Sequence, residues 1–529
     1  MKGMQQARKK LPIGIQNLRD IREGGYYYVD KSEFAMRLID QGKYYFLSRP
    51  RRFGKSLFLD TLKELFEGNQ ALFDGLHAAD RWDWSVQYPV IRISFGSGVL
   101  RSKENLDTRI NELLSENAER LELTLQYESS GGRLMHLIRS AREKYGKSVV
   151  VLIDEYDKPI LDNIEDAERA TVMREGLKDL YSVLKDADPH LKFVFLTGVS
   201  KFSKVSLFSG LNNLRDITIL PEYSALCGYT DADVDTVFAP ELAVGDLDRE
   251  QIREWYNGYN WRGEAVYNPF DLLLLFSERE FRPYWYETGT PTFLLKLLSQ
   301  RQVFLPELSH LQTDAALLGT FDVGNIPTEA LMFQAGYLTI AEEVNAFGEY
   351  KYRLRYPNRE VQQSLNSSLL YDWMPEARQS VMVRSRLGDL LLANDLEGMG
   401  EHMKAFYASL PNEWFTNNPI AQYEGYYASV FYAFFASLGL EITVEASSNP
   451  GRLDMVMRFQ GQVYIFEFKL VGDQADGSAL RQIKEKDYAA PYRGKGEPIH
   501  LIGIEFSKTQ RALLSWQVER DEGSKKLKR

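Results

Sequence analysis

The stretch from residue 44 to residue 59 constrains the fold more than any other part of this chain. It begins with an apolar run, Tyr44 to Leu47, which predicts a short buried strand. After a basic turn, Gly54, Lys55 and Ser56 open a segment whose apolar residues recur with a helical period. Strand, loop, Gly-Lys-Ser and helix together form the arrangement of a phosphate-binding loop, in which backbone N–H groups point at phosphate oxygens.

A loop of this kind predicts bound ATP and a divalent cation, Mg²⁺ or Mn²⁺. Lys55 would contact the β- and γ-phosphates, and the Ser56 hydroxyl would hold the cation. The usual pattern has glycine where this chain has Arg49, and arginine does not adopt positive φ freely, so the entry to the loop must differ. We expect nucleotide contacts from the whole loop, namely Arg49, Pro50, Arg51, Arg52, Phe53, Gly54, Lys55 and Ser56.

Further strands are predicted, with helical segments between them, at residues 90–95, 149–153 and 193–196. This alternation predicts a mainly parallel sheet with helices on both faces, and ligands bind at the carboxyl ends of such strands. Asp154, Glu155 and Thr197 lie at those ends. Asp154 would hold Mg²⁺, Glu155 would act as general base on the attacking water, and Thr197 would contact the γ-phosphate. The alternatives are two solvated carboxylates and an ordinary strand-end hydroxyl.

Composition limits where such a protein works and what it contacts. The 529 residues suggest three or four domains, and the net charge of −10 means that any contact with nucleic acid needs local basic patches. The single cysteine, Cys227, excludes intramolecular disulfides and cysteine-based zinc clusters. The basic N-terminus lacks the apolar segment of a signal peptide, and no apolar run is long enough to span a bilayer. We therefore expect a soluble, cytoplasmic protein without a membrane partner.

Helical patterns dominate from about residue 223. A helix that ends near residue 335 precedes two strand patterns, and this unit could be a winged helix. In the second strand Lys351, Arg353 and Arg355 share one face, which could meet the phosphates of a nucleic acid. The simpler interpretation, which we favour, is a solvated strand face.

A second constellation lies near the C-terminus, after an apolar helix from about residue 424 to residue 438. Two strand patterns flank Gln460-Gly461, a sequence that suits a two-residue turn. Such a turn pairs Asp454 directly with Glu467, with Cβ atoms about 5 Å apart. Lys469 follows two residues later and therefore lies on the same sheet face. A turn longer by one residue would put Asp454 on the opposite face.

Two opposed carboxylates repel each other unless a cation or a proton lies between them. Mg²⁺ suits carboxylate ligands and would stabilise the transition state of phosphodiester cleavage, while Lys469 would position or deprotonate the attacking water. Glu424 could add a carboxylate from the preceding helix, and Gln482, on the following helix, could orient the water. The alternative is a strand with alternating exposed charges, which are common.

These motifs carry a resemblance that covers most of the chain. Residues 11–222 resemble the AAA-ATPase-like family of bacterial proteins through LPIGIQNL, YYVDKS, RPRRFGKSL, VLIDEYDKPI and TGVSKFSKVSLFSGLNNL. Residues 411–516 resemble a PD-(D/E)XK nuclease domain through GRLDMV, EFK and QIKEKDYA. The resemblance implies that Arg49 is a family trait and that Asp454, Glu467, Lys469 and Glu424 match the nuclease core, although Leu453 replaces the proline of "PD".

The expected fold class is α/β: a P-loop NTPase with an AAA/ASCE-type parallel sheet, a helical or winged-helix lid, and an α/β nuclease domain. The expected domains are residues 1–222 (ATPase), 223–375 (lid), 376–410 (helical connector), 411–520 (nuclease) and 521–529 (disordered basic tail). The resulting hypothesis is an ATPase and metal-dependent endonuclease that acts on nucleic acid, with DNA as the expected substrate, and is gated by ATP. The alternative is a nucleotide-controlled switch or scaffold that binds nucleic acid or a protein without cleaving. A homo-oligomer is compatible with either.

Overall fold

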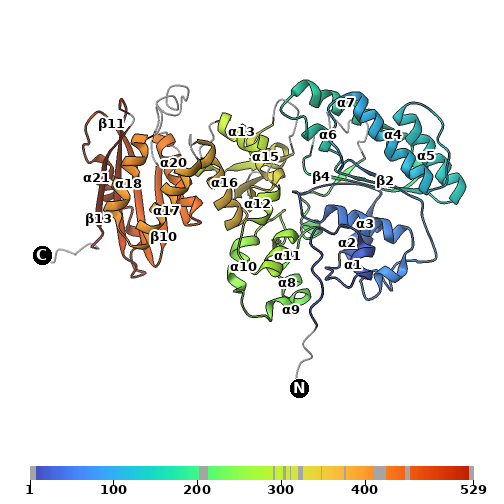
Figure 1. Ribbon diagram of the computed structural model, residues 1–529, viewed down its shortest axis with the longest axis horizontal. Coiled ribbons are helices and arrows are strands. Elements are labelled where there is room, and N and C mark those ends of the chain that lie inside the picture. The colour runs from blue at the N-terminus through green and yellow to red at the C-terminus, as the bar shows by residue number, and fades with distance from the viewer. Residues whose placement is uncertain are drawn as a thin grey trace, which may run out of the picture. The chain divides into compact units, whose positions relative to one another are not determined.

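The computed structural model describes residues 7–201, 213–289, 292–301, 305–309, 311–319, 326–346, 348–373, 377–409, 424–446, 453–510 and 512–522 (Figure 1). The chain divides into two compact units, Met1–Gly289 with Gln312–Asn358, and Thr290–Leu311 with Arg359–Arg529. The boundary expected at residue 222 therefore falls inside the first unit, and the expected lid is shared between the two units. The expected tail lies, from residue 523 on, outside the described residues.

The first unit is built on a parallel five-stranded sheet with strand order β2-β3-β4-β1-β5. All residues of β1 and β3 are buried, as is usual for strands covered on both faces. Strand β4 lies between β1 and β3. The strands are β1 (Tyr44–Ser48), β2 (Val90–Ser94), β3 (Val149–Asp154), β4 (Leu191–Gly198) and β5 (Arg215–Asp216).

Helices cover both faces of this sheet (Figure 1). One face carries α1 (Leu18–Glu23), α2 (Ser32–Gln41) and α3 (Lys55–Phe66), and the other carries α4 (Lys103–Arg120), α5 (Ser130–Tyr145), α6 (Lys158–Leu161) and α7 (Ala167–Asp186). Local sequence fixes where the longer helices begin, because Ser102, Ser129 and Asp166 each accept a hydrogen bond from a backbone N–H of the first turn.

The rest of the first unit is a helical layer followed by a small sheet. Aromatic and aliphatic side chains of the helices pack around Phe238 and Tyr256, together with Tyr27 and Val29 from the N-terminal segment. The helices are α8 (Asp231–Val237), α9 (Ala239–Leu242), α10 (Arg249–Tyr256), α11 (Pro269–Glu278) and α12 (Tyr284–Gly289).

The small sheet has the order β6-β8-β7 and contains the predicted hairpin. The hairpin follows directly after α15, as the sequence predicts, while the winged helix stays a prediction. The elements are β6 (Gln312–Asp314), α14 (Ala315–Leu318), α15 (Thr328–Ala335), β7 (Thr339–Ala346) and β8 (Glu349–Arg355).

The second unit contains a mixed sheet with strand order β13-β12-β11-β10-β9, in which only the pair β11–β12 is parallel among the described strands. Its strands are β9 (Glu441–Ala446), β10 (Leu453–Phe459), β11 (Gln462–Val471), β12 (Ile499–Ser507) and β13 (Leu513–Arg520). Its helices are α13 (Thr292–Arg301), α16 (Arg359–Trp373), α17 (Ala377–Leu392), α18 (Leu396–Ser409), α20 (Glu424–Ser437) and α21 (Ser478–Glu485).

The two faces of this mixed sheet are covered by different helices. Phe431 of α20 packs on Phe466 and Phe468. Leu480 and Ile483 of α21 pack with Val463 and Ile465 of β11. These odd-numbered residues of β11 face the side of the sheet opposite to that of Phe466 and Phe468. Within the described ranges, no helix combines the length and the apolar character that crossing a membrane requires.

Candidate functional site

The Gly-Lys-Ser loop turns sharply from the end of β1 into α3. Gly54, the residue before the helix, has φ +90°, and Arg52 has φ +68°, so the chain passes twice through the left-handed region. Glycine adopts this conformation without strain, which explains why it precedes Lys55. The first turn of α3 therefore presents its N-terminus to the loop, where anions bind favourably.

Lys55 is held inside the loop by its own backbone. Its Nζ atom donates to the carbonyl oxygens of Arg49 and Pro50, at 3.0 Å and 2.8 Å. Burial lowers the pKa of the Lys55 ammonium, and the nearby carboxylate of Asp154 opposes this effect. Phosphate oxygens would be stronger acceptors than these neutral carbonyls, so the ammonium is suited to exchange them for an anionic ligand.

Arg49 has a different position from the one that we expected. Its guanidinium donates to the carbonyl oxygens of Ser48, Thr218 and Tyr223 at 2.8–3.0 Å. It also lies 4.0 Å from the ring centre of Trp261. The side chain is fully buried, burial lowers its pKa to about 10, and it does not line the nucleotide-sized cavity. Arg49 therefore fastens the loop to neighbouring segments, and its side chain does not line the cavity where we expected it to contact nucleotide.

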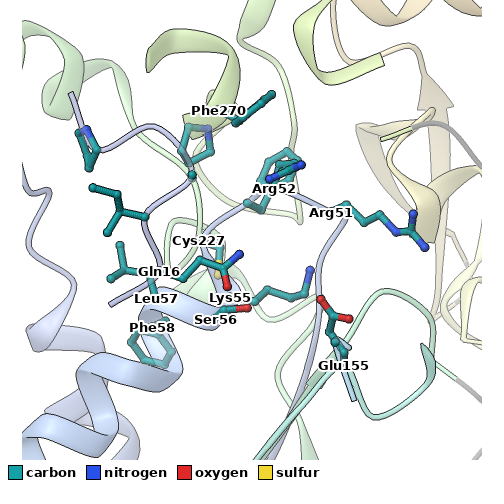
Figure 2. A pocket seen from close by; sticks show the side chains of 18 of the residues that line it. Gln16, Arg51, Arg52, Lys55, Ser56, Leu57, Phe58, Glu155, Cys227 and Phe270 are labelled. Carbon is teal, nitrogen blue, oxygen red and sulfur yellow. The ribbon is translucent and has the colours of Figure 1, made fainter. Parts of the chain in front are cut away.

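The cavity beside the loop has a volume of about 520 Å³, within the range of small-ligand sites (Figure 2). One part of its lining is polar and basic, from Arg51 to Ser56, with Glu155 beside it. Another part is largely apolar and aromatic, and consists of Pro12, Ile15, Tyr27, Tyr28, Val29, Leu226, Tyr229, Phe270 and Leu273. A site that joins a cationic part to an apolar part fits a nucleoside triphosphate, whose phosphates are anionic and whose flat base can stack on apolar and aromatic side chains.

The acidic strand end contributes one predicted residue to this cavity. Glu155 lines it and has φ +50°, a left-handed conformation that is uncommon for glutamate. Burial, followed by the neighbouring charge of Asp154, raises the pKa of its carboxyl group. Asp154 and Thr197 do not line the cavity. The Asp154 carboxylate accepts the N–H of Glu155 at 3.0 Å, and the Thr197 hydroxyl donates to the carbonyl of Leu47 at 2.9 Å.

Sequence reasoning missed Asp157, which also lines the cavity. Its buried carboxylate accepts hydrogen bonds from the backbone N–H groups of Val199 and Ser200 and from the Ser200 hydroxyl, at 2.6–3.1 Å for the nearer oxygen. Burial raises its pKa, against the effect of these hydrogen bonds. Asp157 thereby ties the segment after β3 to the segment after β4. The only signal in the sequence was a third acid in the run Asp-Glu-Tyr-Asp.

The oxygen ligands available near the loop suit Mg²⁺, which prefers hydroxyl and carboxylate oxygens. Ser56 and Glu155 line the cavity, and Asp154 lies at the end of β3 beside Glu155. Together with the cations of the loop, this donor set fits ATP bound with Mg²⁺.

In the second unit the predicted strand register is confirmed. Asp454 pairs with Glu467 across β10 and β11, and Gln460 and Gly461 form the two-residue turn with φ +48° and +71°. Glu467 is fully buried, and its Oε1 lies 3.1 Å from Nζ of Lys469. The Asp454 side chain lies outside what the structure describes.

The face that carries these positions is the one covered by α21. Val456, Val463 and Ile465 pack against α21, and side chains two residues apart share a face, so positions 454, 467 and 469 belong to it. Gln482 of α21 donates to the hydroxyl of Tyr488 at 3.2 Å. Glu424 begins α20, whose aromatic side chains pack on the other face, and its own side chain is not among those described.

Sequence reasoning also missed Glu505, the parallel register partner of Lys469 on β12. Its buried carboxylate accepts hydrogen bonds from the N–H groups of Asp476 and Ala479 and from the Ser478 hydroxyl, at 3.1–3.3 Å. It therefore fixes the start of α21 over the sheet.

Carboxylates opposed across β10 and β11 are suitable ligands for a divalent cation. Among the side chains that the structure describes, no group of three acidic, histidine or cysteine residues could hold a metal ion.

The basic stripe on β8 has the predicted alternation. Lys351, Arg353 and Arg355 are exposed, and the residues between them are buried. Arg353, however, forms an ion pair with Glu342 of β7 at 3.0 Å. The face is therefore mixed in charge, which favours the simpler interpretation of a solvated strand.

The parallel sheet with β4 between β1 and β3, the Gly-Lys-Ser loop and the acidic strand end are consistent with a P-loop NTPase domain, joined to a mixed-sheet domain of the PD-(D/E)XK type. Family models agree: residues 12–208 match a family described as predicted AAA-ATPase, and residues 422–516 match the PD-(D/E)XK nuclease superfamily. A protein of Azotobacter chroococcum mcd 1, described as an uncharacterized protein in the vnfD 5′ region, is 59% identical over 514 residues, which cover 97% of this chain and 99% of the relative. The chain belongs to the AAA-ATPase-like family and carries a C-terminal PD-(D/E)XK nuclease domain.

Proposed function

We propose that this protein binds and hydrolyses ATP in its first unit and cleaves DNA in its second, with both reactions dependent on Mg²⁺ and the second gated by ATP. The observation that carries the proposal is the pairing of Asp454 with Glu467, with Lys469 beside them, in a chain that also holds a nucleotide-sized cavity at its Gly-Lys-Ser loop. A purely binding module would not need this catalytic set.

In the ATPase site, Lys55 and the N-terminus of α3 bind the phosphates. Ser56 and Asp154 would hold Mg²⁺, which when bound neutralises charge on the β- and γ-phosphates. Glu155 accepts the proton of the attacking water, and its raised pKa makes it a stronger base than an ordinary glutamate once it is ionised. Asp157 holds the segment after β4 in place, as a positioning residue.

In the nuclease site, Asp454 and Glu467 would hold the divalent cation, which when bound stabilises the charge that develops on the scissile phosphate. Lys469 positions the attacking water and assists its deprotonation. Gln482 orients the same water, and Glu424 supplies an additional carboxylate. The remaining parts of the proposal are a winged-helix lid, a homo-oligomeric assembly and a cytoplasmic location.

Cleavage of plasmid, linear duplex and single-stranded DNA, and of RNA, with Mg²⁺ or Mn²⁺ tests the proposal. Each reaction is run with and without ATP, using wild type, Lys469→Ala and Lys55→Ala, with Lys404→Ala, a half-buried lysine of α18, as the matched control. We expect cleavage of DNA that is lost in Lys469→Ala and retained in Lys404→Ala. ATP should alter the cleavage rate in wild type and in Lys404→Ala but not in Lys55→Ala. Equal cleavage rates with and without ATP, and in Lys55→Ala, would refute the gating.

The ion pair between Glu467 and Lys469 supports a second candidate, because it gives the buried carboxylate a cationic partner within the chain. In this alternative the second unit binds nucleic acid or a protein without cleaving, and ATP controls that binding. It predicts no cleavage of any substrate, combined with a binding affinity that differs between the ATP-bound and nucleotide-free states.

A further inference from the structure

The three arginines of the loop have three different surroundings. Arg49 is buried and bonded to backbone carbonyls. The guanidinium of Arg52 lies 4.6 Å from the ring centre of Phe270, which belongs to the apolar part of the cavity lining. Arg51 lines the same cavity with an exposed side chain. Figure 2 shows Arg52 directed toward Phe270, while Arg51 leaves the loop in another direction, away from Phe270.

The backbone that carries Arg51 is fixed from outside the loop. Its carbonyl oxygen accepts a hydrogen bond from the indole N–H of Trp285 at 3.1 Å. The preceding residue, Pro50, packs so closely on Gly336 that a Cβ atom there would lie 2.8 Å from the proline ring. A proline has a restricted backbone, and these contacts restrict it further. The Arg51 side chain therefore extends from a rigid point of attachment.

The guanidinium of Arg51 has no ion pair or hydrogen bond with the residues that the structure describes. Lys55 is bonded to two carbonyls and Arg52 lies against an aromatic ring, so Arg51 is the cation of the loop that is left for an anionic ligand. A guanidinium presents planar donors that match two oxygens of one phosphate. The cavity that Arg51 lines also contains Lys55, Ser56 and Glu155, which are the proposed phosphate and water contacts.

We infer that Arg51 stabilises the transferring γ-phosphate from within the same chain, so that hydrolysis needs no arginine from a second molecule. The inference rests on the proposed ATPase activity. The water oxygen forms a bond to the γ-phosphorus, the bond from that phosphorus to the bridging oxygen breaks, and ADP leaves with the electron pair. Glu155 takes the proton of the water, and Arg51 stays protonated and donates hydrogen bonds to the γ-phosphate oxygens.

Steady-state ATPase measurements on the full chain test the role of Arg51. An arginine in this role contributes about 10³-fold or more to kcat. We expect Arg51→Ala to lose about that factor in kcat with a nucleotide Kd that changes less than about threefold, and Arg51→Lys to lose less. We expect Arg52→Ala to raise KM more than it lowers kcat, because Arg52 lies beside the apolar part. Arg169→Ala, on the exposed surface of α7, serves as the control with wild-type kinetics.

Mixing two inactive variants tests whether Arg51 acts within its own chain. Lys55→Ala retains Arg51, and Arg51→Ala retains the phosphate-binding lysine, so an arginine that acted between chains would restore activity in the mixture. We expect no restoration, and a wild-type kcat that does not change on dilution. Restoration, or an unchanged kcat in Arg51→Ala while wild type hydrolyses ATP, would overturn the inference alone. Absence of hydrolysis by wild type would overturn the proposed function and the inference together.

Discussion

Nζ of Lys469 lies 3.1 Å from Oε1 of Glu467, two residues earlier on β11, and Asp454 is the register partner of that glutamate on β10. One turn and one strand alternation thus bring three charged positions to one sheet face.

Glu467→Gln should abolish metal-dependent cleavage. The substitution keeps the shape of the side chain and removes the charge that would hold the cation, so we expect a loss of about 10²-fold or more at saturating Mg²⁺. Cleavage of a labelled DNA duplex measures the rate. Glu519→Gln, an exposed glutamate on β13, should cleave at the wild-type rate. Activity of Glu467→Gln equal to that of wild type would remove Glu467 from the site.

Chelation of the metal should stop cleavage by wild type, and added Mg²⁺ should restore it.

Gly461→Ala should destabilise the second unit. Gly461 has φ +71°, which alanine adopts at a cost of about 1 kcal/mol, and the turn sets the register of Asp454. Urea denaturation measures the loss. Gly472→Ala is the matched control, since a Cβ atom at Gly472 would meet no neighbour and its φ is not positive. At the other residue of the turn, Gln460→Asn should not lower the free energy of unfolding, because asparagine tolerates the left-handed conformation better than glutamine. Equal losses in both glycine variants would contradict the turn geometry.

Arg49→Gly should destabilise the first unit, although it restores the glycine that phosphate-binding loops usually have at this position. The variant removes the guanidinium hydrogen bonds to the buried carbonyls of Ser48, Thr218 and Tyr223, together with the contact with Trp261. We expect a loss of about 2–4 kcal/mol in the free energy of unfolding. Thermal or chemical denaturation checks the value against Arg169→Ala. Unchanged stability with improved nucleotide affinity would show that Arg49 faces the nucleotide after all.

The stability of wild type relative to Asp157→Asn should depend on pH. Burial raises the pKa of Asp157 in the folded state above 3.8, the ordinary value of an aspartate. The folded state therefore binds a proton more readily than the unfolded state, and wild type gains stability relative to the variant as pH falls from neutral through the raised pKa toward 3.8. Denaturation of both proteins at a series of pH values measures this difference.

Asp83→Asn is the control for the pH experiment, because its effect on stability should change with pH in the opposite direction. Hydrogen bonds from Ser85 lower the pKa of Asp83, so wild type should lose stability relative to this variant as pH falls below 3.8. If the stability difference between wild type and Asp157→Asn did not change with pH, the pKa of Asp157 would not be raised in the folded state.

Much of the fold followed from local patterns. The spacing of apolar residues and the type of turn residues located β1, α3 and the β10–β11 hairpin. Both signals are properties of consecutive residues. The two-residue period of the strands and the two-residue turn also predicted the pairing of Asp454 with Glu467. The sequence was less informative for Glu155 and Thr197, since both end predicted strands but only Glu155 lines the cavity.

By itself, the sequence determined the phosphate-binding loop, the acidic strand end and the opposed carboxylates, each within one or two adjacent elements. Only the tertiary structure decided what Arg49 does, because its acceptors, Thr218 and Tyr223, and its ring partner, Trp261, come from segments far away in the chain. It likewise decided that Asp157 binds the segment after β4 and that Glu505 fixes α21. The direction of a charged side chain depends on the partners that the fold supplies, and those partners are not encoded next to it.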